Sequence, residues 1–82
     1  MSAVALQNDT VWLETRNYDV VALNGKLTAY LPELSKALGE GVPAYSDSSR
    51  DGFYDVELSS GWSYIHVRDD ARTVYLVAFS RN

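Results

Sequence analysis

Polar and apolar residues alternate in three consecutive segments between Phe53 and Phe79. The segments are 53–58, 62–68 and 73–79, and short stretches rich in Ser, Gly and Asp separate them. Segments of this length that are rich in β-branched and aromatic residues are typical of antiparallel strands joined by tight turns. The sequence therefore predicts a three-strand meander, and the rest of the chain must pack around it.

The second hairpin of this meander can be aligned from its turn. A turn within Asp69–Arg72 places Arg68 opposite Thr73, and the other pairs follow by counting along both strands. A shift by one residue would move every side chain to the other face of the sheet, so this alignment also assigns the faces. The expected pairs are Val67 with Val74, His66 with Tyr75, Ile65 with Leu76, Tyr64 with Val77, Ser63 with Ala78 and Trp62 with Phe79.

The first hairpin is aligned by two carboxylates. A three-residue turn at 59–61 would bury Asp55 and Glu57 on the aliphatic face, at a cost of several kcal/mol for each unpaired charge. We therefore expect a turn of even length, which moves both carboxylates to the face that carries the aromatic residues. The resulting pairs are Asp55 with His66 and Glu57 with Tyr64.

Two further apolar segments, 10–16 and 18–23, lie in the N-terminal part of the chain on either side of Asn17. Asparagine tolerates the left-handed backbone conformation that a short hairpin loop requires. A three-residue turn at 16–18 aligns Val11 with Leu23 and Leu13 with Val21 on one face, and leaves Trp12 and Glu14 on the other. The sequence therefore predicts a second hairpin here.

A change of period after Asn24–Gly25 predicts the one helix of the fold. The apolar residues that recur at helical spacing are Leu27, Tyr30 or Leu31, Leu34 and Leu38. Gly39 and Gly41 mark the C-terminus of the helix. Pro32 leaves two starts open, because the helix can begin near Thr28 with the proline in its first turns or at Pro32 itself.

These elements predict one α+β domain over residues 1–82, with a two-layer antiparallel sheet in the order β-β-α-β-β-β and the helix on its aliphatic face. A chain of 82 residues buries roughly 60–65% of its unfolded surface, which supports one core. Residues 1–9 are expected to be a flexible N-terminus. Alternatively, Ala3–Leu6 or the loop at 39–52 folds over the face of the sheet that the helix leaves open. Residues 39–52 show no hydrophobic period, so we expect a long loop that is most mobile at 45–50.

The composition narrows the classes of function. The formal net charge of −4 and an isoelectric point near 4.6 disfavour binding to nucleic acid or anionic lipid and favour a basic protein partner. The chain has no cysteine, which removes disulfides, thiol catalysis and cysteine-based zinc sites. Because no apolar run reaches the length of a membrane helix and no signal peptide is apparent, we expect a cytoplasmic location.

Two local patterns resemble functional motifs. Residues 47–52 have the spacing that opens a calcium-binding loop, but the twelfth position, which should supply a bidentate carboxylate, is Leu58. His66 is the only histidine, and Asp55 beside it would orient the ring for proton transfer, but no nucleophile motif accompanies the pair. We therefore expect a polar turn and a structural cross-strand pair, with no metal, no cofactor and no enzymatic activity.

Residues Tyr64–Arg81 resemble the closing hairpin of RelE-like ribonuclease toxins. The resemblance covers only this hairpin. Those toxins are basic and open with a helical hairpin, whereas this chain is acidic and is expected to open with strands. The alternative implied by the resemblance is a protein that contacts or cleaves RNA, and the residues for that role would be His66, Arg68, Arg72 and Arg81.

The second face of the meander is the candidate binding surface. One helix covers only one face of the sheet, so the other face should be partly exposed. Because aromatic residues and arginine supply most energetic hot spots of protein interfaces, we expect a non-catalytic protein-binding role. Inhibitors, antitoxin or immunity-type proteins, phage accessory proteins and assembly subunits are examples. A homodimer through this face or through an exposed edge strand is an alternative. The residues expected at this surface are Trp62, Tyr64, His66, Arg68, Tyr75, Phe79, Asp55 and Glu57.

Overall fold

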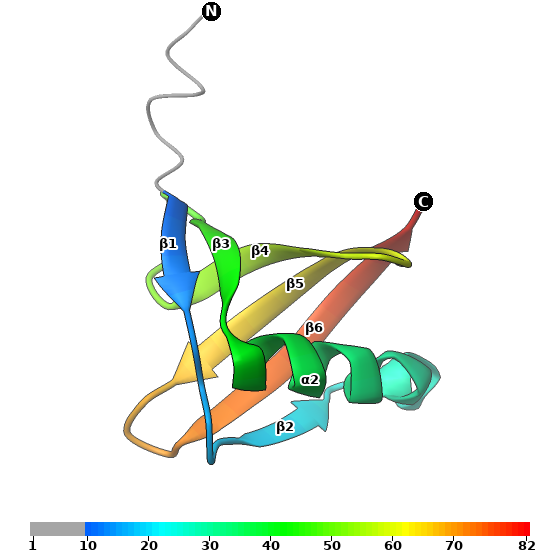
Figure 1. The fold of residues 1–82 in the computed structure, drawn as a ribbon, viewed down its shortest axis with the longest axis horizontal. Helices are drawn as coiled ribbons and strands as arrows, with labels where there is room; N and C mark the ends of the chain where they lie inside the picture. Colours follow the sequence, from blue (N-terminus) through cyan, green and yellow to red (C-terminus); the bar gives the residue numbers. More distant parts are fainter. Residues whose placement is uncertain (1–9) are drawn as a thin grey trace, which may run out of the picture.

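The structure is a computed structural model that describes residues 10–82. Its elements in chain order are β1 (Thr10–Leu13), β2 (Asp19–Ala22), the 3-10 helix η1 (Gly25–Tyr30), α2 (Leu31–Glu40), β3 (Val42–Ser46), β4 (Phe53–Leu58), β5 (Gly61–Arg68) and β6 (Thr73–Arg81). The strands form one six-stranded sheet in the order β1-β3-β4-β5-β6-β2, and α2 lies against one side of it (Figure 1). The α+β class is confirmed. The strictly antiparallel arrangement and the strand order are wrong, because β2 runs parallel to β6 and β3 adds a strand.

The meander of β4, β5 and β6 is confirmed, including the even length of the first turn. The observed pairs of the first hairpin are Phe53 with His66, Asp55 with Tyr64 and Glu57 with Trp62. The expected pairing of Asp55 with His66, and of Glu57 with Tyr64, is therefore wrong by two residues. A shift of two residues leaves every side chain on the same face, because side chains alternate with a period of two.

A register shift in the second hairpin moves one predicted surface residue to the other side of the sheet. The expected register holds from Arg68 to Ile65, which pairs with Leu76, and then an extra residue on β6 makes Tyr64 pair with Ala78. Such a bulge reverses the faces beyond it. Phe79 consequently lies on the helix side, where it stacks on Tyr30 with ring centroids 3.8 Å apart. Its expected position beside Trp62 is wrong.

The predicted N-terminal hairpin is also wrong, although its turn is of the expected kind. Asn17 adopts the left-handed conformation with φ of 75°, but β1 pairs with β3 and β2 pairs with β6. The end of α2 lies between the two strands, since the backbone N–H of Thr15 donates to the carbonyl of Leu38 at 2.9 Å. This bond satisfies a carbonyl that has no partner inside the helix.

The two edge strands of the sheet are joined by residues 14–18 alone. A flat six-stranded sheet would hold its edges about 24 Å apart. The connection is instead a tight turn, in which the N–H of Tyr18 donates to the carbonyl of Thr15 at 3.3 Å. The sheet must therefore curl so that β1 and β2 approach each other at one end, with α2 on the concave side (Figure 1).

The α-helix begins at Leu31, one residue before the later of the two expected starts, and a 3-10 segment precedes it. The side chain of Asn24 accepts a hydrogen bond from the N–H of Lys26 at 2.9 Å, and η1 then leads into α2 at Leu31. Pro32 lies in the first turn of α2, where a missing N–H costs no helical hydrogen bond. The helix ends at Gly41, whose φ is 93°. The core between α2 and the sheet consists of Leu34, Leu38, Ala44, Val56, Leu58, Ile65, Val74 and Leu76.

The prediction of a loop over 39–52 is wrong for half of that range, because the helix runs to Glu40 and β3 occupies Val42–Ser46. The side chains of β3 alternate, and Ala44 is fully buried toward the helix. Pro43 concealed this strand in the sequence, since proline interrupts the pairing of a central strand. Only residues 47–52 connect β3 to β4.

Candidate functional site

The side of the sheet opposite α2 carries the candidate site, which we call the outer face. Its members on β3, β4, β5 and β6 are Tyr45, Phe53, Asp55, Glu57, Trp62, Tyr64, His66, Arg68 and Tyr75. The aromatic side chains are half-buried against one another, and Trp62 remains 37% exposed. Seven predicted surface residues lie on this face, whereas Phe79 does not. Tyr45 was missed because its segment was interpreted as a loop. Phe53 was not named as a surface residue, although the expected turn already placed it on the same face as Asp55 and Glu57.

The rings of the outer face form two groups of contacts, one between β3 and β5 and one across β4, β5 and β6. Phe53 is central, because it stacks on His66 with centroids 4.1 Å apart and packs on Tyr64 at 5.5 Å. Tyr45 and Trp62 approach to 5.7 Å with their planes tilted by 49°. Offset and tilted arrangements of this kind are favourable for aromatic pairs. The outer face therefore carries two aromatic groups, and Asp55 lies between Tyr45 of the first group and Tyr64 of the second.

The loop between β3 and β4 is fastened to the outer face by Asp47. Its carboxylate accepts hydrogen bonds from the hydroxyl of Tyr64 and from the N–H and hydroxyl of Ser49. The bond from Tyr64, followed by those from Ser49, lowers the pKa of Asp47, and the same contact with Asp47 raises the pKa of Tyr64. Asp47 therefore holds Tyr64 in place and adds a negative charge beside the rings.

Asp55 lies in the middle of the outer face, between Tyr45 on β3 and Tyr64 on β5. Within residues 10–82 its carboxylate has no hydrogen bond and no ion pair. Burial raises the pKa of Asp55, and the negative charge of Asp47 raises it further. The expected partner, His66, instead faces Phe53, so the proposed carboxylate–histidine pair does not form.

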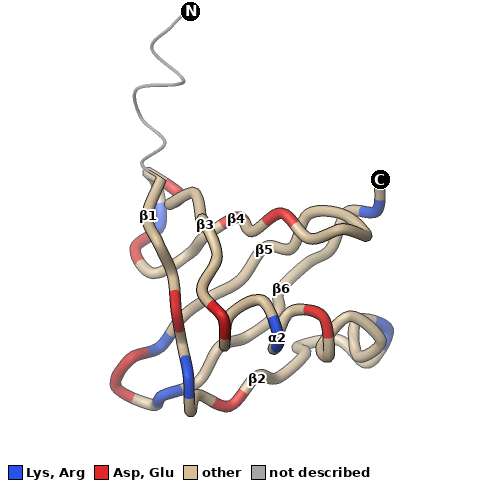
Figure 2. The backbone as a smooth tube through the Cα atoms, in the orientation of Figure 1, with Lys and Arg blue, Asp and Glu red and all other residues tan. Residues whose placement is uncertain are grey.

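The basic residues considered for RNA do not gather at one place. The guanidinium of Arg68 binds Asp70 in a two-point contact of 2.8 and 3.1 Å. Arg72 precedes β6, whereas Arg81 ends it, and a strand of this length separates the two residues by roughly 25 Å. Figure 2 shows both signs of charge in the turn between β5 and β6.

The part of the sequence that resembles a calcium loop is a polar turn. Asp47 uses its carboxylate for Ser49 and Tyr64, and the guanidinium of Arg50 lies 4.0 Å from the ring centroid of Phe53. Among the residues that the structure describes, no three carboxylate or histidine side chains are grouped so that they could hold a metal ion.

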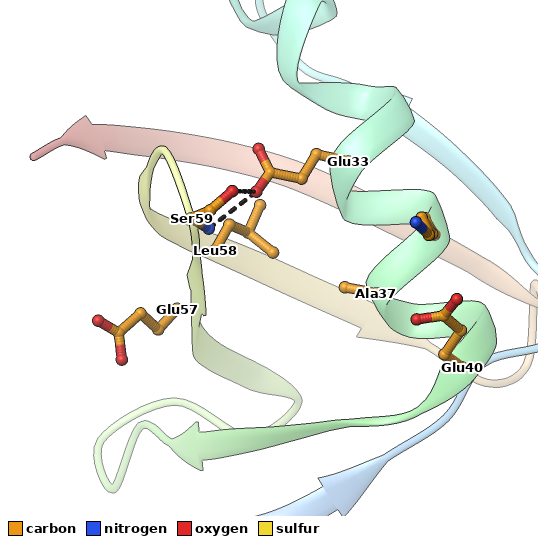
Figure 3. A pocket seen from close by; sticks show the side chains of 7 residues that line it. Glu33, Ala37, Glu40, Glu57, Leu58 and Ser59 are labelled. Atoms are coloured by element: carbon orange, nitrogen blue, oxygen red, sulfur yellow. Dashed lines mark hydrogen bonds between the residues drawn. The ribbon is translucent and has the colours of Figure 1, made fainter.

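A pocket of about 330 Å³ lies between α2 and β4 (Figure 3). It opens where β3 leaves β4, after the pair of Tyr45 and Asp55. The N–H of Asp47 donates to the carbonyl of Phe53, so the backbone N–H groups that point toward β4 are those of every second residue counted back from Asp47. The first of these residues is Tyr45 and the second is Pro43. Because proline has no N–H to donate, the ladder ends there.

One of the charged side chains that line this pocket, Glu33, already accepts hydrogen bonds from the protein. The carboxylate of Glu33 accepts hydrogen bonds from the N–H and hydroxyl of Ser59 and from the hydroxyl of Ser60, at 2.5–2.8 Å. These bonds lower the pKa of Glu33. Figure 3 shows Glu33 reaching the turn after β4, while Glu57 points away from the helix. Glu33 thus connects α2 to the β4–β5 turn at this pocket. The outer face remains the candidate site.

The arrangement on the outer face offers shape, aromatic surface and charge for binding. No helix within the described part of the chain is long and apolar enough to cross a membrane. Any assignment of function rests on the geometry above, because a comparison of the chain with protein-family models, curated proteins and solved structures gave no match.

Proposed function

We propose that this protein binds a protein partner on its outer face and has no catalytic role of its own. The observation that supports the proposal is the set of aromatic side chains, in two groups of ring contacts, on the side of the sheet that α2 leaves uncovered. Tyrosine and tryptophan supply most hot spots of protein interfaces because they bury a large area at a low entropic cost. Trp62, at 37% exposure, is the member best placed to insert into a partner.

The charge of the outer face indicates the kind of partner. β4 contributes two acidic residues to this face, Asp55 and Glu57, and the loop adds Asp47 together with Arg50, whose guanidinium lies over Phe53. Acidic residues thus outnumber the basic one here, and Figure 2 shows acidic positions along β4. Arg68 is neutralised by Asp70. A basic protein surface would therefore be attracted to the outer face and would be oriented by it. Inhibitors, antitoxin or immunity-type proteins, phage accessory proteins and assembly subunits are the classes that use such a surface.

The test is capture of the partner from the native host, followed by affinity measurements with the purified partner. Trp62→Ser should weaken binding by about 30-fold or more, which corresponds to the loss of a hot spot of about 2 kcal/mol. Val11→Ser is the matched control, because Val11 is 36% exposed but pairs with the inward-facing Ala44. A folded Trp62→Ser protein that binds as tightly as the wild type would contradict the proposal.

Self-association must be measured on the same proteins. If analytical ultracentrifugation shows a dimer that Trp62→Ser dissociates and Val11→Ser does not, the outer face binds a second copy of this chain. That result would replace the proposal of a different protein partner by the homodimer alternative.

A further inference from the structure

The most unusual group on the outer face is the carboxylate of Asp55. It is half-buried among aromatic rings, and within residues 10–82 nothing donates a hydrogen bond to it. A carboxylate held in this way lowers the stability of the folded protein, because its charge is partly desolvated and unpaired. Folding alone therefore gives no reason for an aspartate at this position.

Four aromatic residues are neighbours of Asp55 in the sheet, either along its own strand or on the strands beside it. Tyr45 and Tyr64 are its neighbours across β3 and β5, Phe53 precedes it by two residues on β4, and Trp62 faces Glu57 two residues beyond. The ring faces of tyrosine, phenylalanine and tryptophan attract cations through their quadrupoles. The position thus combines a free carboxylate with the π surfaces that favour a positive charge.

The protein already holds one cation on this surface. The guanidinium of Arg50 lies over the ring of Phe53, with its carbon 4.0 Å from the ring centroid. The carboxylate of Asp47 lies next to the face and that of Asp55 lies on it, and Glu57 adds a third carboxylate further along β4. The charge around Asp55 is therefore negative, and a cation supplied by a partner would complement it.

We infer that the protein partner inserts an arginine side chain at Asp55, between the rings of Tyr45, Trp62 and Tyr64. The guanidinium group fits this position better than an ammonium group, because it binds both oxygens of a carboxylate and its plane stacks on aromatic rings. The inference rests on the proposed function and names the partner's contact group. The partner's binding segment is accordingly basic and presents an exposed arginine.

The inference can be tested without the partner by titrating the protein with the tripeptides Arg-Arg-Arg, Lys-Lys-Lys and Gln-Gln-Gln in an NMR experiment. The arginine peptide should shift the resonances of Asp55, Tyr64 and the Trp62 indole N–H in a saturable manner, and more tightly than the lysine peptide. Asp55→Asn should weaken this binding by about fivefold. Glu40→Gln, which removes the same charge from an exposed position on α2, should leave it unchanged.

Equal weakening by Asp55→Asn and Glu40→Gln would mean unspecific attraction to an acidic protein and would overturn the inference. Equal affinity for the arginine and lysine peptides would overturn the choice of guanidinium. Binding of a single-stranded RNA oligomer to the outer face, with no response to the arginine peptide, would overturn it in favour of RNA. If Trp62→Ser abolishes capture of the partner and Asp55→Asn does not, the proposed function stands and this inference fails.

Discussion

Replacement of Phe79 by alanine tests the register shift that separates the core from the outer face. Phe→Ala in a fully buried site costs about 3–5 kcal/mol, and Phe79 is half-buried on the helix side. The near-parallel stack on Tyr30, with an interplanar angle of 6°, contributes about 0.5–1.5 kcal/mol of this cost. We therefore expect the free energy of unfolding to fall by about 2–3 kcal/mol, a large part of the roughly 4–12 kcal/mol expected for 82 residues.

The assay is urea unfolding followed by circular dichroism, in a double-mutant cycle of Phe79→Ala and Tyr30→Ala. A coupling energy of about 0.5–1.5 kcal/mol is expected between the two rings. Ser80→Ala is the control, because the neighbouring position is exposed and pairs with Trp62 on the outer face; it should change stability by less than about 0.5 kcal/mol. Additive effects of the two ring mutations, within about 0.3 kcal/mol, would refute the stack and the bulge that creates it.

Two further predictions concern pH. The pKa of Glu33 in the folded protein lies below its ordinary value of 4.5, so its contribution to stability is present above that pH and is lost as the pH falls; Glu33→Gln should flatten this acid loss in melting curves recorded between about pH 6 and pH 3. The pKa of Asp55 lies above its ordinary value of 3.8, so the folded protein is stabilised relative to the unfolded chain while Asp55 is protonated. This stabilisation is complete below pH 3.8 and is lost as the pH rises through the folded-state pKa. Asp55→Asn should therefore melt higher than the wild type at neutral pH and lose this advantage in acid, and a lower melting temperature at neutral pH would contradict the absence of a partner for Asp55.

The sequence predicted the faces of the meander but not its full register. Side chains alternate between the two sides of a strand, so the length of a turn decides which side chains share a face. Because burying Asp55 and Glu57 would be costly, the first turn was correctly predicted to have an even length. A shift of two residues leaves the same side chains on the same side, so no pattern of polarity could distinguish His66 from Tyr64 as the partner of Asp55. The bulge before Phe79 was hidden for a related reason, because an extra residue becomes visible only when both strands are aligned.

The pairing of the outer strands could not be predicted from local sequence. Residues around Asn17 satisfied every requirement of a hairpin, and the turn conformation is the expected one. The partners of β1 and β2 are instead decided by the core, because α2 occupies the space between the two strands. Four of the six rings followed from the meander, namely Trp62, Tyr64, His66 and Tyr75. Tyr45 depended on recognising β3 beside a proline.

The parallel pairing of β2 with β6 has a consequence for the order in which the chain is synthesised. β2 leaves the ribosome before the helix and before four other strands, but its partner is the most C-terminal strand of the sheet. The hydrogen-bonding edge of β2 therefore stays open to wrong partners during most of translation. The meander, whose contacts are local, can form as soon as β6 is complete, and β2 then has a finished edge to join. A pause in translation upstream of β6 would thus prolong the state in which this chain is most prone to aggregate.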